Sequence, residues 1–447
     1  MAKETAELAH YAASCRYEDI PPDVIERAKQ CITDTIAAVI FGYHLPWSRI
    51  VVAFAQKNGV GGNSRVLGPG GPRVHAPAAA LANGALAHAF EMDNLTWPST
   101  GVHPGATLLA SGLAVAQERG MGGRELLTAV VAGAEVMIRI GRATKHSNEG
   151  RGFHAPGTTG PFGAAIACGR LMGFDEERMK NALGIAGSLA CGLLEFARSG
   201  TGAMVKRLHL GRAAESGVLA ASLAGEGFTG PASVLEGEFG FLRVFCGNEF
   251  DPHELTDGLG DSYATRSIMF KRFPCHITAH TSVQAILDLR AEHGYAAADV
   301  ASIHIAGNDK MARVNNIPSP ADIMMAQYSI PFCVALAHVR DPRDPRSFDE
   351  GALREQQIRA LAERVTITIA KDRPTPLAAA VTVALKDGRV FTRCVAGFKG
   401  TPEQPLDRGE LREKFLLLTR HCSAHDMCEM FDRLQNLERE SDLDWIG

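Results

Sequence analysis

The chain has 447 residues, of which 46% are hydrophobic and 21% are charged, and its net charge is -4. This composition is typical of a globular protein with a large core, and it excludes the strongly basic balance of nucleic-acid-binding proteins. The longest apolar runs are shorter than the roughly 18 residues that suggest a membrane span. We therefore expect neither a nucleic-acid partner nor a membrane partner.

The N-terminus and the cysteines predict a cytoplasmic protein. The first residues, MAKETAELAH, contain two acidic residues and no apolar stretch, which argues against a secretory signal. The ten cysteines are scattered and form no C-x-x-C pair. In a long chain without a signal this pattern favours reduced thiols over a disulfide framework.

Helices are predicted over most of the first 260 residues. Segment 21–42 begins with prolines and carries apolar residues at helical spacing. The segments 76–93, 103–120 and 124–145 follow, separated by glycine-bearing turns and rich in alanine and glycine. Because small residues let helices approach closely, we expect a tightly packed helical bundle.

The pattern changes after about residue 265. Segments 300–307 and 364–370 alternate β-branched residues, and segment 378–397 predicts two strands around a turn. Helical patterns lie near 277–293 and 320–340, and the chain becomes helical again after about residue 400. The predicted fold is mainly α. A large all-helical domain (residues 1–265 and 398–447) is interrupted by a smaller α+β lid domain (residues 266–397), with a cleft between them that favours a small-molecule site.

Residues 421–428, HCSAHDMC, are a weak candidate for a metal site. On a helix, His421, His425 and Cys428 would share one face. They supply three ligands at best, and no second Cys/His cluster completes the set. We therefore favour a helical surface with two buried thiols and predict no metal site.

Polar stretches that interrupt the apolar helices carry the first candidate site residues. Asp93 ends one predicted helix, His103 opens the next, and Thr96 lies in the loop between them. His154 lies in a loop of glycine, proline and threonine before a helix of small residues, where free N–H groups can bind a carboxylate. Taken alone, these residues also fit a capping histidine or a plain connector.

The remaining candidates are basic. Lys206 lies in a segment followed by small residues, so it is either a functional lysine between close helices or a snorkelling one. The stretch KRFPCHITAH, residues 271–280, begins with Lys271 and reaches His276 where a predicted strand gives way to a helix. It fits a metal site, a nucleophile with its base, a carboxylate pocket or the polar start of a helix.

Together these residue types suit one kind of chemistry. Lysines and histidines neutralise a substrate with two or three carboxylates, and an aspartate orients a histidine and raises its basicity. A histidine can then move a proton to or from a carbon next to a carboxylate. Elimination of water, decarboxylation and epimerisation all fit, and none requires a metal ion if cationic side chains stabilise the developing charge.

Several of these motifs, in this order, resemble the MmgE/PrpD family over nearly the whole chain. They are NGALAHAFEMDN, HPGA, GFHAPGTTGPFGAA, VKRLHLGRAA and FKRFPCHITAH. The family includes 2-methylcitrate dehydratase, cis-aconitate decarboxylase and iminodisuccinate epimerase. The resemblance implies a large helical domain with a smaller α+β lid, a homodimer, and a cofactor-free active site between the domains.

The resemblance also implies a set of active-site residues. The set falls on Asp93, His103, His154, Lys206, Lys271 and His276. Many relatives have paired aspartates where this chain has Asp93-Asn94, and Thr96 is the nearest counterpart of a threonine used by the decarboxylases. Because this loop is expected to contact the substrate, the departure leaves the substrate itself open.

We therefore predict a cofactor-free and metal-free lyase that acts on a small di- or tricarboxylate. His103, oriented by Asp93, is the predicted proton-transfer group, with His276 as a second acid or base. The predicted substrate contacts are His154, Lys206, Lys271 and Thr96, and they form one site with the catalytic residues. Decarboxylation and dehydration are not separated, epimerisation is the alternative reaction, and a non-catalytic carboxylate-binding protein is the third hypothesis.

Overall fold

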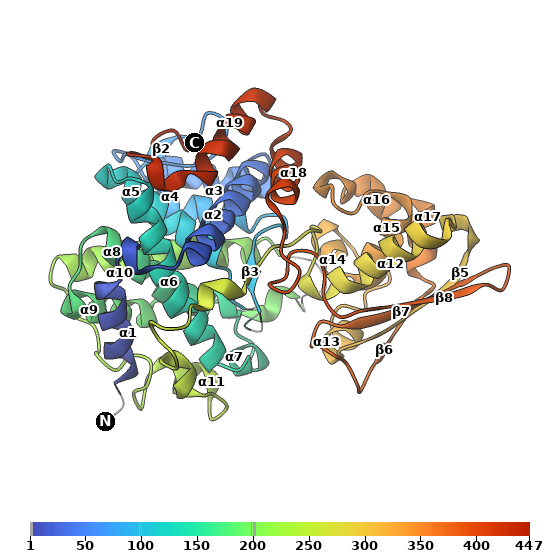
Figure 1. Cartoon of the computed structure of the whole chain (residues 1–447), viewed down its shortest axis with the longest axis horizontal. Helices are drawn as coiled ribbons and strands as arrows, with labels where there is room; N and C mark the ends of the chain where they lie inside the picture. The colour runs from blue at the N-terminus through green and yellow to red at the C-terminus, as the bar shows by residue number, and fades with distance from the viewer. Residues whose placement is uncertain (1–2, 98, 100, 198, 200–202) are drawn as a thin grey trace.

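The larger of two lobes is a helical bundle built from both ends of the chain. The computed structural model describes residues 3–97, 99, 101–197, 199 and 203–447. It is mainly α, as predicted, and the bundle occupies the left of Figure 1. Its helices are α1 (Glu4–Ser14), α2 (Pro22–Tyr43), α3 (Pro46–Asn58), α4 (Ala76–Ala87), α5 (Ala110–Arg119), α6 (Gly123–Ala143), α7 (Ser147–Gly150), α8 (Ala155–Leu171), α9 (Glu176–Ser188), α10 (Val205–Gly225), α11 (Phe241–Cys246), α18 (Arg408–Thr419) and α19 (Ala424–Gln435).

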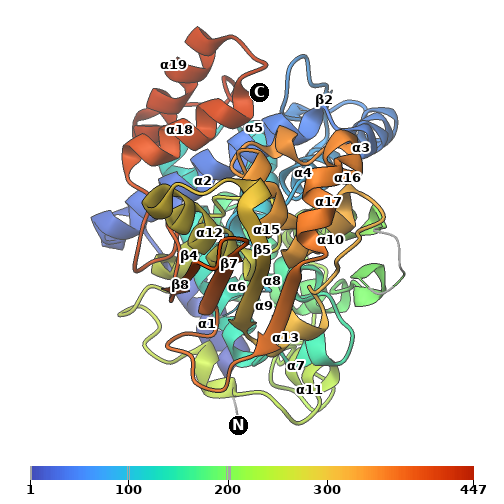
Figure 2. The same cartoon turned by 90° about the vertical axis from the view of Figure 1, so that its right-hand side faces the viewer.

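The smaller lobe combines helices with a four-stranded sheet. The helices are α12 (His280–His293), α13 (Asp309–Arg313), α14 (Ile323–Tyr328), α15 (Ile330–Val339), α16 (Glu350–Arg354) and α17 (Gln356–Ala362). The strands are β5 (Val300–Gly307), β6 (Val365–Ile369), β7 (Ala379–Leu385) and β8 (Val390–Val395). Their order is β6-β5-β7-β8, with β5 and β6 parallel and the other pairs antiparallel. Helix α12 packs on β7 and β8, and Figure 2 looks onto this lobe.

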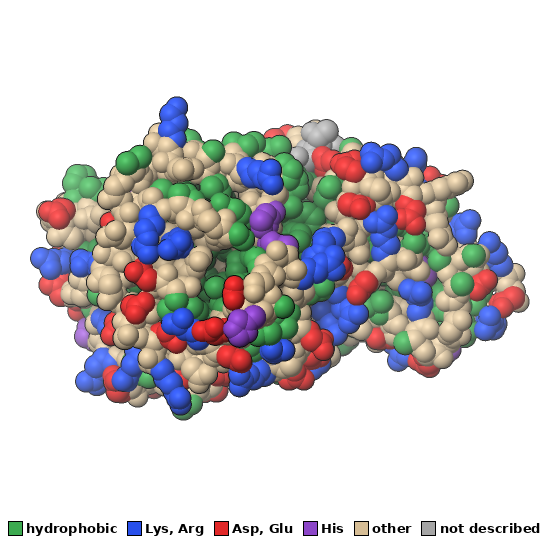
Figure 3. Space-filling view, turned by 90° about the horizontal axis from the view of Figure 1, so that it is seen from above, with side chains coloured by type: hydrophobic (Ala, Val, Ile, Leu, Met, Phe, Trp, Pro, Cys, Tyr) green, Lys and Arg blue, Asp and Glu red, His purple; other side chains and the backbone are tan. Residues whose placement is uncertain are grey.

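Each lobe has its own hydrophobic core. The larger core draws on residues 8–270 and 406–446, and the smaller core on residues 273–395 together with Phe90. Strand β3 (Leu95–Thr96) pairs antiparallel with β4 (Ile268–Met269), which connects the loop after α4 to the segment that leads into the smaller lobe. Lysine and arginine side chains gather where the lobes meet in the view of Figure 3. The predicted domain boundaries at residues 265 and 397 stay a prediction.

The crossing of α4 and α10 positions the ends of both helices. A Cβ atom on Gly84 would lie 2.8 Å from the Cα of Gly211, and one on Gly211 would lie 2.2 Å from the carbonyl oxygen of Leu81. The two backbones therefore approach closely only because these residues lack side chains. The contact brings the C-terminus of α4 beside the N-terminus of α10, where Arg207 Nε donates to the carbonyl oxygen of Ala89 (3.0 Å).

Two predicted helices are shorter than expected. The helix predicted over 76–93 ends at Ala87, so that residues 88–93 form an irregular turn. The helix predicted over 320–340 breaks at Ser329, which caps α15 through its side chain one position before the Ile330-Pro331 start. Proline lacks the N–H that would continue the preceding helix, so it favours a new helix start.

Most residues of helix α2 are buried in the larger core. Among the described residues, no single helix combines the length and hydropathy needed to cross a membrane. The pair α2 and α3 passes that test only when counted together, and it bends by 96° at the break.

Candidate active site

A cavity of about 650 Å³ lies between the two lobes. Five predicted site residues line it: His103, His154, Lys206, Lys271 and His276. Asp93 is fully buried and contacts one of them from behind. The structure therefore brings together residues that are up to 183 positions apart, from Asp93 to His276, as expected for a binding cleft between domains.

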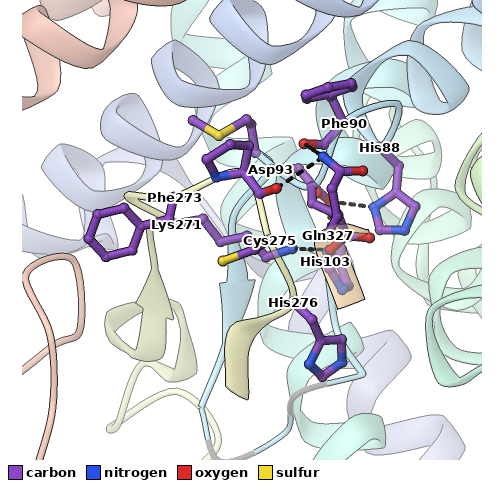
Figure 4. A network of polar contacts seen from close by, with 12 residues as sticks. His88, Phe90, Asp93, His103, Lys271, Phe273, Cys275, His276 and Gln327 are labelled. Atoms are coloured by element: carbon purple, nitrogen blue, oxygen red, sulfur yellow. Dashed lines mark hydrogen bonds and ion pairs between the residues drawn. The ribbon is translucent and has the colours of Figure 1, made fainter. Parts of the chain in front are cut away.

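Asp93 holds two imidazole rings. The Nδ1–H groups of His103 and His88 both donate to Asp93 Oδ2, at 2.7 and 2.9 Å (Figure 4). An ionised carboxylate only accepts hydrogen bonds, so each imidazole must carry its proton on Nδ1. Burial acts to raise the pKa of Asp93, but the two histidines outweigh it and hold the pKa well below its usual range. Nε2 of His103 is thus left as the nitrogen that can exchange a proton with a molecule in the cavity.

Two lysines share one buried carboxylate. Lys271 Nζ donates to Glu91 Oε2 at 2.6 Å, and Lys206 Nζ is in direct contact with Glu91 Oε1. Burial lowers the pKa of both lysines, and the charges of Lys271 and Arg207 add to this effect at Lys206. The contacts with Glu91 oppose these shifts, because an adjacent negative charge favours the ammonium form. We therefore treat the group as two ammonium ions bridged by one carboxylate.

The other two predicted histidines have polar partners of their own. His154 Nδ1 lies 2.8 Å from His209 Nδ1, so one ring donates and the other accepts. His276 Nδ1 lies 2.8 Å from the hydroxyl of Thr278, which in turn donates to Asn315 Oδ1. Burial lowers the pKa of His154 and of His276 well below the usual value. Both rings are accordingly neutral near neutral pH. Because the Thr278 hydroxyl donates to Asn315, His276 donates its Nδ1–H to Thr278, and its Nε2 is left as an acceptor.

The stretch 271–280 crosses from the cavity into the smaller core. Lys271 and His276 line the cavity, whereas Cys275 is fully buried and lies 3.7 Å from His280 Nδ1. Gln327 from α14 donates to the carbonyl oxygens of Pro274 and Phe90, each at 3.0 Å (Figure 4). Gln327 thereby joins this stretch to the turn after α4. Cys275 and His280 therefore pack against each other within the smaller lobe and do not line the cavity.

Thr96 is the predicted substrate contact that the structure does not place on the cavity wall. Its neighbours Leu95 and Trp97 line the cavity, whereas Thr96 is fully buried and its hydroxyl donates to the carbonyl oxygen of Ser99 (2.9 Å). Side chains alternate between the two sides of an extended segment, so Thr96 points away from the side of its neighbours. Its substrate contact stays a prediction that this geometry does not support.

The structure contains one arrangement with metal-ligand spacing among the described residues. His88, Asp93 and His103 bring three possible ligand atoms within 4.8 Å of one another. Nδ1 of His88 and Nδ1 of His103 are both at hydrogen-bond distance from Asp93 Oδ2. A metal ion bound between these atoms would have to replace the two Nδ1 protons. The group therefore fits a hydrogen-bonded triad directly, and a metal only after deprotonation.

The stretch HCSAHDMC does not form such a group in the described part of the chain. His421 and Cys422 precede α19, and Ser423 caps that helix, so His421 and His425 do not share a helical face. Cys422 and Cys428 are half-buried rather than buried, which differs from the prediction. The N-cap Ser423 starts the helix only at Ala424, so His421 lies outside the helical spacing that the prediction assumed.

Several cavity residues were missed by the sequence prediction. They are His88, Glu91, Lys310, Tyr328 and Arg373. His88 and Glu91 stand in the same stretch as Asp93, and a glutamate in an alanine-rich apolar segment was an available signal. Lys310, Tyr328 and Arg373 come from the smaller lobe, where no local pattern distinguishes them from surface residues.

Fold and site together define a mainly α protein of two lobes with a basic, histidine-rich cavity suited to a carboxylate. The MmgE/PrpD N-terminal domain matches residues 6–253, and the MmgE/PrpD C-terminal domain matches residues 273–437. The chain belongs to the MmgE/PrpD family.

Its relatives include several decarboxylases. A cis-aconitate decarboxylase from Aspergillus terreus is 34% identical over 300 residues, which is 65% of this chain and 60% of that protein. Those of Homo sapiens and Mus musculus are 29% and 27% identical, each over 93% of this chain and over 88% and 87% of their own length. The match thus spans about 60% of the length of the Aspergillus relative and most of the mammalian ones.

Proposed function

We propose that this protein is a lyase that removes carbon dioxide from a small polycarboxylate such as cis-aconitate. The observation that carries the proposal is the pairing of His103 with Asp93 in the same cavity as Lys206 and Lys271. The relatives named cis-aconitate decarboxylase support decarboxylation over the other reactions of the family. Dehydration and epimerisation use a similar carbanion and remain the alternatives that an experiment must separate.

The proposed reaction takes up one proton for each molecule of carbon dioxide released. Cleavage of the bond to the leaving carboxylate releases carbon dioxide and leaves its electron pair on the substrate, delocalised toward a neighbouring carboxylate. Lys206 and Lys271 stabilise that charge because both ammonium groups line the cavity and are almost fully buried. His103, protonated and stabilised by Asp93, donates a proton from Nε2 to carbon. The ring then regains a proton from solvent, so each turnover consumes one proton.

The remaining residues bind and orient the substrate. His154 donates from Nε2 to a carboxylate oxygen, with His209 as the donor to its Nδ1. His276 takes up a proton at Nε2 before it contacts a carboxylate, so it acts as a second acid or base. Lys310 and Arg373, contributed by the smaller lobe, face a second carboxylate at the other side of the cavity. This distribution of cations suits a substrate with two or three carboxylates.

We also propose that the reaction needs no metal or organic cofactor and that the protein works as a cytoplasmic homodimer. The metal-free reaction rests on the hydrogen-bonded arrangement of His88, Asp93 and His103 and on the lysine pair as the source of positive charge. The homodimer rests on the family resemblance, and the location on the ten scattered cysteines, which form no C-x-x-C pair. Sedimentation equilibrium of the purified chain tests the dimer directly, and a single monomeric species would contradict it.

The reaction is tested with a substrate panel in D2O, followed by NMR. The panel holds cis-aconitate, 2-methylcitrate, citrate and iminodisuccinate. Release of carbon dioxide with one deuterium on carbon is the expected result for cis-aconitate. A new alkene formed by loss of water would indicate a dehydratase, and deuterium uptake with inversion an epimerase. Binding without turnover of any compound would leave a carboxylate-binding protein. His103→Ala should abolish turnover while the fold is retained.

A further inference from the structure

Glu91 lies at the centre of the cavity wall and occupies both lysines at once. One carboxylate oxygen contacts Lys206 from α10, and the other accepts from Lys271 at 2.6 Å. The side chains of all three residues are almost fully buried, with exposed fractions of 7% or less. The two oxygens of Glu91 therefore take the positions that a substrate carboxylate needs in order to bridge the same two ammonium groups.

The backbone at Glu91 is held in a conformation that glutamate seldom adopts. Its φ is +58°, in the left-handed region, although it is not a glycine. Side chains from three different helices fix the carbonyl groups around it. Arg207 donates to Ala89 O at 3.0 Å, Gln327 to Phe90 O at 3.0 Å, and Lys414 to Met92 O at 2.9 Å.

A tight turn does not need three buried side chains bonded to its carbonyl groups, as the turn at Glu91 has. A strained residue persists only where its surroundings over-determine it, and such residues cluster at active sites. Arg207, Gln327 and Lys414 are all buried, so their hydrogen bonds are protected from water. These hydrogen bonds fix the backbone so that the Glu91 side chain is directed toward Lys206 and Lys271.

We infer that Glu91 is a built-in competitor for the substrate carboxylate and thereby sets how tightly, and with how many carboxylates, the cavity binds its substrate. The inference rests on the proposed function, because it assumes that a substrate carboxylate binds Lys206 and Lys271. Before substrate binds, the negative charge of Glu91 keeps both lysines protonated. Without this counter-charge, two adjacent buried ammonium groups would not both stay charged. On binding, the substrate takes over at least one of them, and Glu91 withdraws from that lysine.

Two consequences separate this role from a purely structural one. Removing the charge of Glu91 removes a competing anion, so a polycarboxylate should bind more tightly wherever the lysines are charged. The same change removes the counter-charge of the lysines, so their pKa values should fall and binding should weaken as the pH rises. A residue that only ties two elements together would lose stability on mutation but would show neither effect.

The experiment is isothermal titration calorimetry with propane-1,2,3-tricarboxylate, a saturated tricarboxylate without the double bond that assists decarboxylation. We expect Glu91→Gln to bind it at least about tenfold more tightly than the unchanged protein near pH 6, the low end of the tested range, where protonating both lysines costs least. We expect this gain to shrink toward pH 8.5, with proton uptake on binding by the variant only. Glu135→Gln is the matched control. It removes another buried carboxylate, one that accepts hydrogen bonds from Thr265 and does not line the cavity, and should change the affinity less than about threefold.

The outcomes distinguish the two proposals. If the unchanged protein fails to bind this or any tricarboxylate, the proposed function fails, and the role of Glu91 with it. If the unchanged protein binds but Glu91→Gln binds equally or more weakly near pH 6, only the role of Glu91 is overturned. If the variant does not fold, a crystal structure of the unchanged protein with bound tricarboxylate tests the role of Glu91 instead. Glu91 separated from one lysine supports the inference, and Glu91 still bridging both lysines overturns it.

Discussion

Asp93→Asn tests whether the carboxylate behind His103 acts in the reaction or only in folding. Asp93 Oδ2 accepts hydrogen bonds from both His103 and His88, and the asparagine amide has nearly the same shape. The amide carries no charge, and its NH2 group donates rather than accepts. If that group faces His103, the ring proton must move from Nδ1 to Nε2. The cavity would then face the wrong tautomer for taking up a proton there.

The size of the effect follows from the geometry. The Nδ1···Oδ2 distance of 2.7 Å places the centres of the imidazolium and carboxylate charges about 4 Å apart. At an effective dielectric constant of about 20, two unit charges at that separation interact by about 4 kcal/mol. That energy corresponds to about a thousandfold in rate, because about 1.4 kcal/mol is a factor of ten. We expect kcat to fall by this factor and KM to change little, since Asp93 is not on the cavity wall.

The assay is the initial rate of carbon dioxide release on the substrate that the panel identifies, with circular dichroism as the check on folding. Glu135→Gln is the matched control. Glu135 is equally buried, and it accepts hydrogen bonds from Thr265 far along the chain, but it does not line the cavity. Its kcat should stay within about threefold of the unchanged protein. A folded Asp93→Asn variant with a kcat within about tenfold of the unchanged protein would refute the reasoning.

Three further predictions concern stability and metal dependence. Burial lowers the pKa of His209 and of His338 to about 4, below the value of about 6.5 in an unfolded chain. The unfolded chain therefore binds more protons between these values. The free energy of unfolding should be highest above about pH 6.5 and fall as the pH drops toward 4, and constant urea midpoints over that range would contradict this. Dialysis against EDTA should leave turnover unchanged, whereas a loss restored by a divalent metal would make the Asp93 cluster a metal site. Gly105→Ala should lower the free energy of unfolding by about 1–3 kcal/mol, because its Cβ would lie 1.9 Å from Thr35 Oγ1, and an unchanged melting temperature would count against it.

Periodicity explains why much of the fold was predictable from the sequence. The strands predicted at 300–307 and 378–397 are present as β5, β7 and β8, and every second residue of β7 is buried. Alternation of this kind depends only on side chains pointing to opposite faces of a strand, so it is visible in one segment. The mainly α fold was predictable for a similar reason from helices such as α2, whose buried apolar residues recur at helical spacing.

The end of α4 was not predictable in this way. The apolar pattern continues to Asp93, but the helix stops at Ala87. The turn that follows is fixed by Arg207, Gln327 and Lys414, which bind its carbonyl groups from helices far away in the sequence. Local propensity extends the helix, and three long-range hydrogen bonds override it.

The same distinction holds for the site. The sequence by itself determined the types of chemical group available, namely His103, His154, Lys206, Lys271 and His276, because polar residues stand out within apolar helices. It did not determine that Glu91 bridges the lysines, that His88 shares Asp93 with His103, or that Thr96 faces away from the cavity. Only the tertiary structure decided these points. Each depends on the distance and direction between side chains from different elements, and those are set by the packing of α4 against α10 and of one lobe against the other.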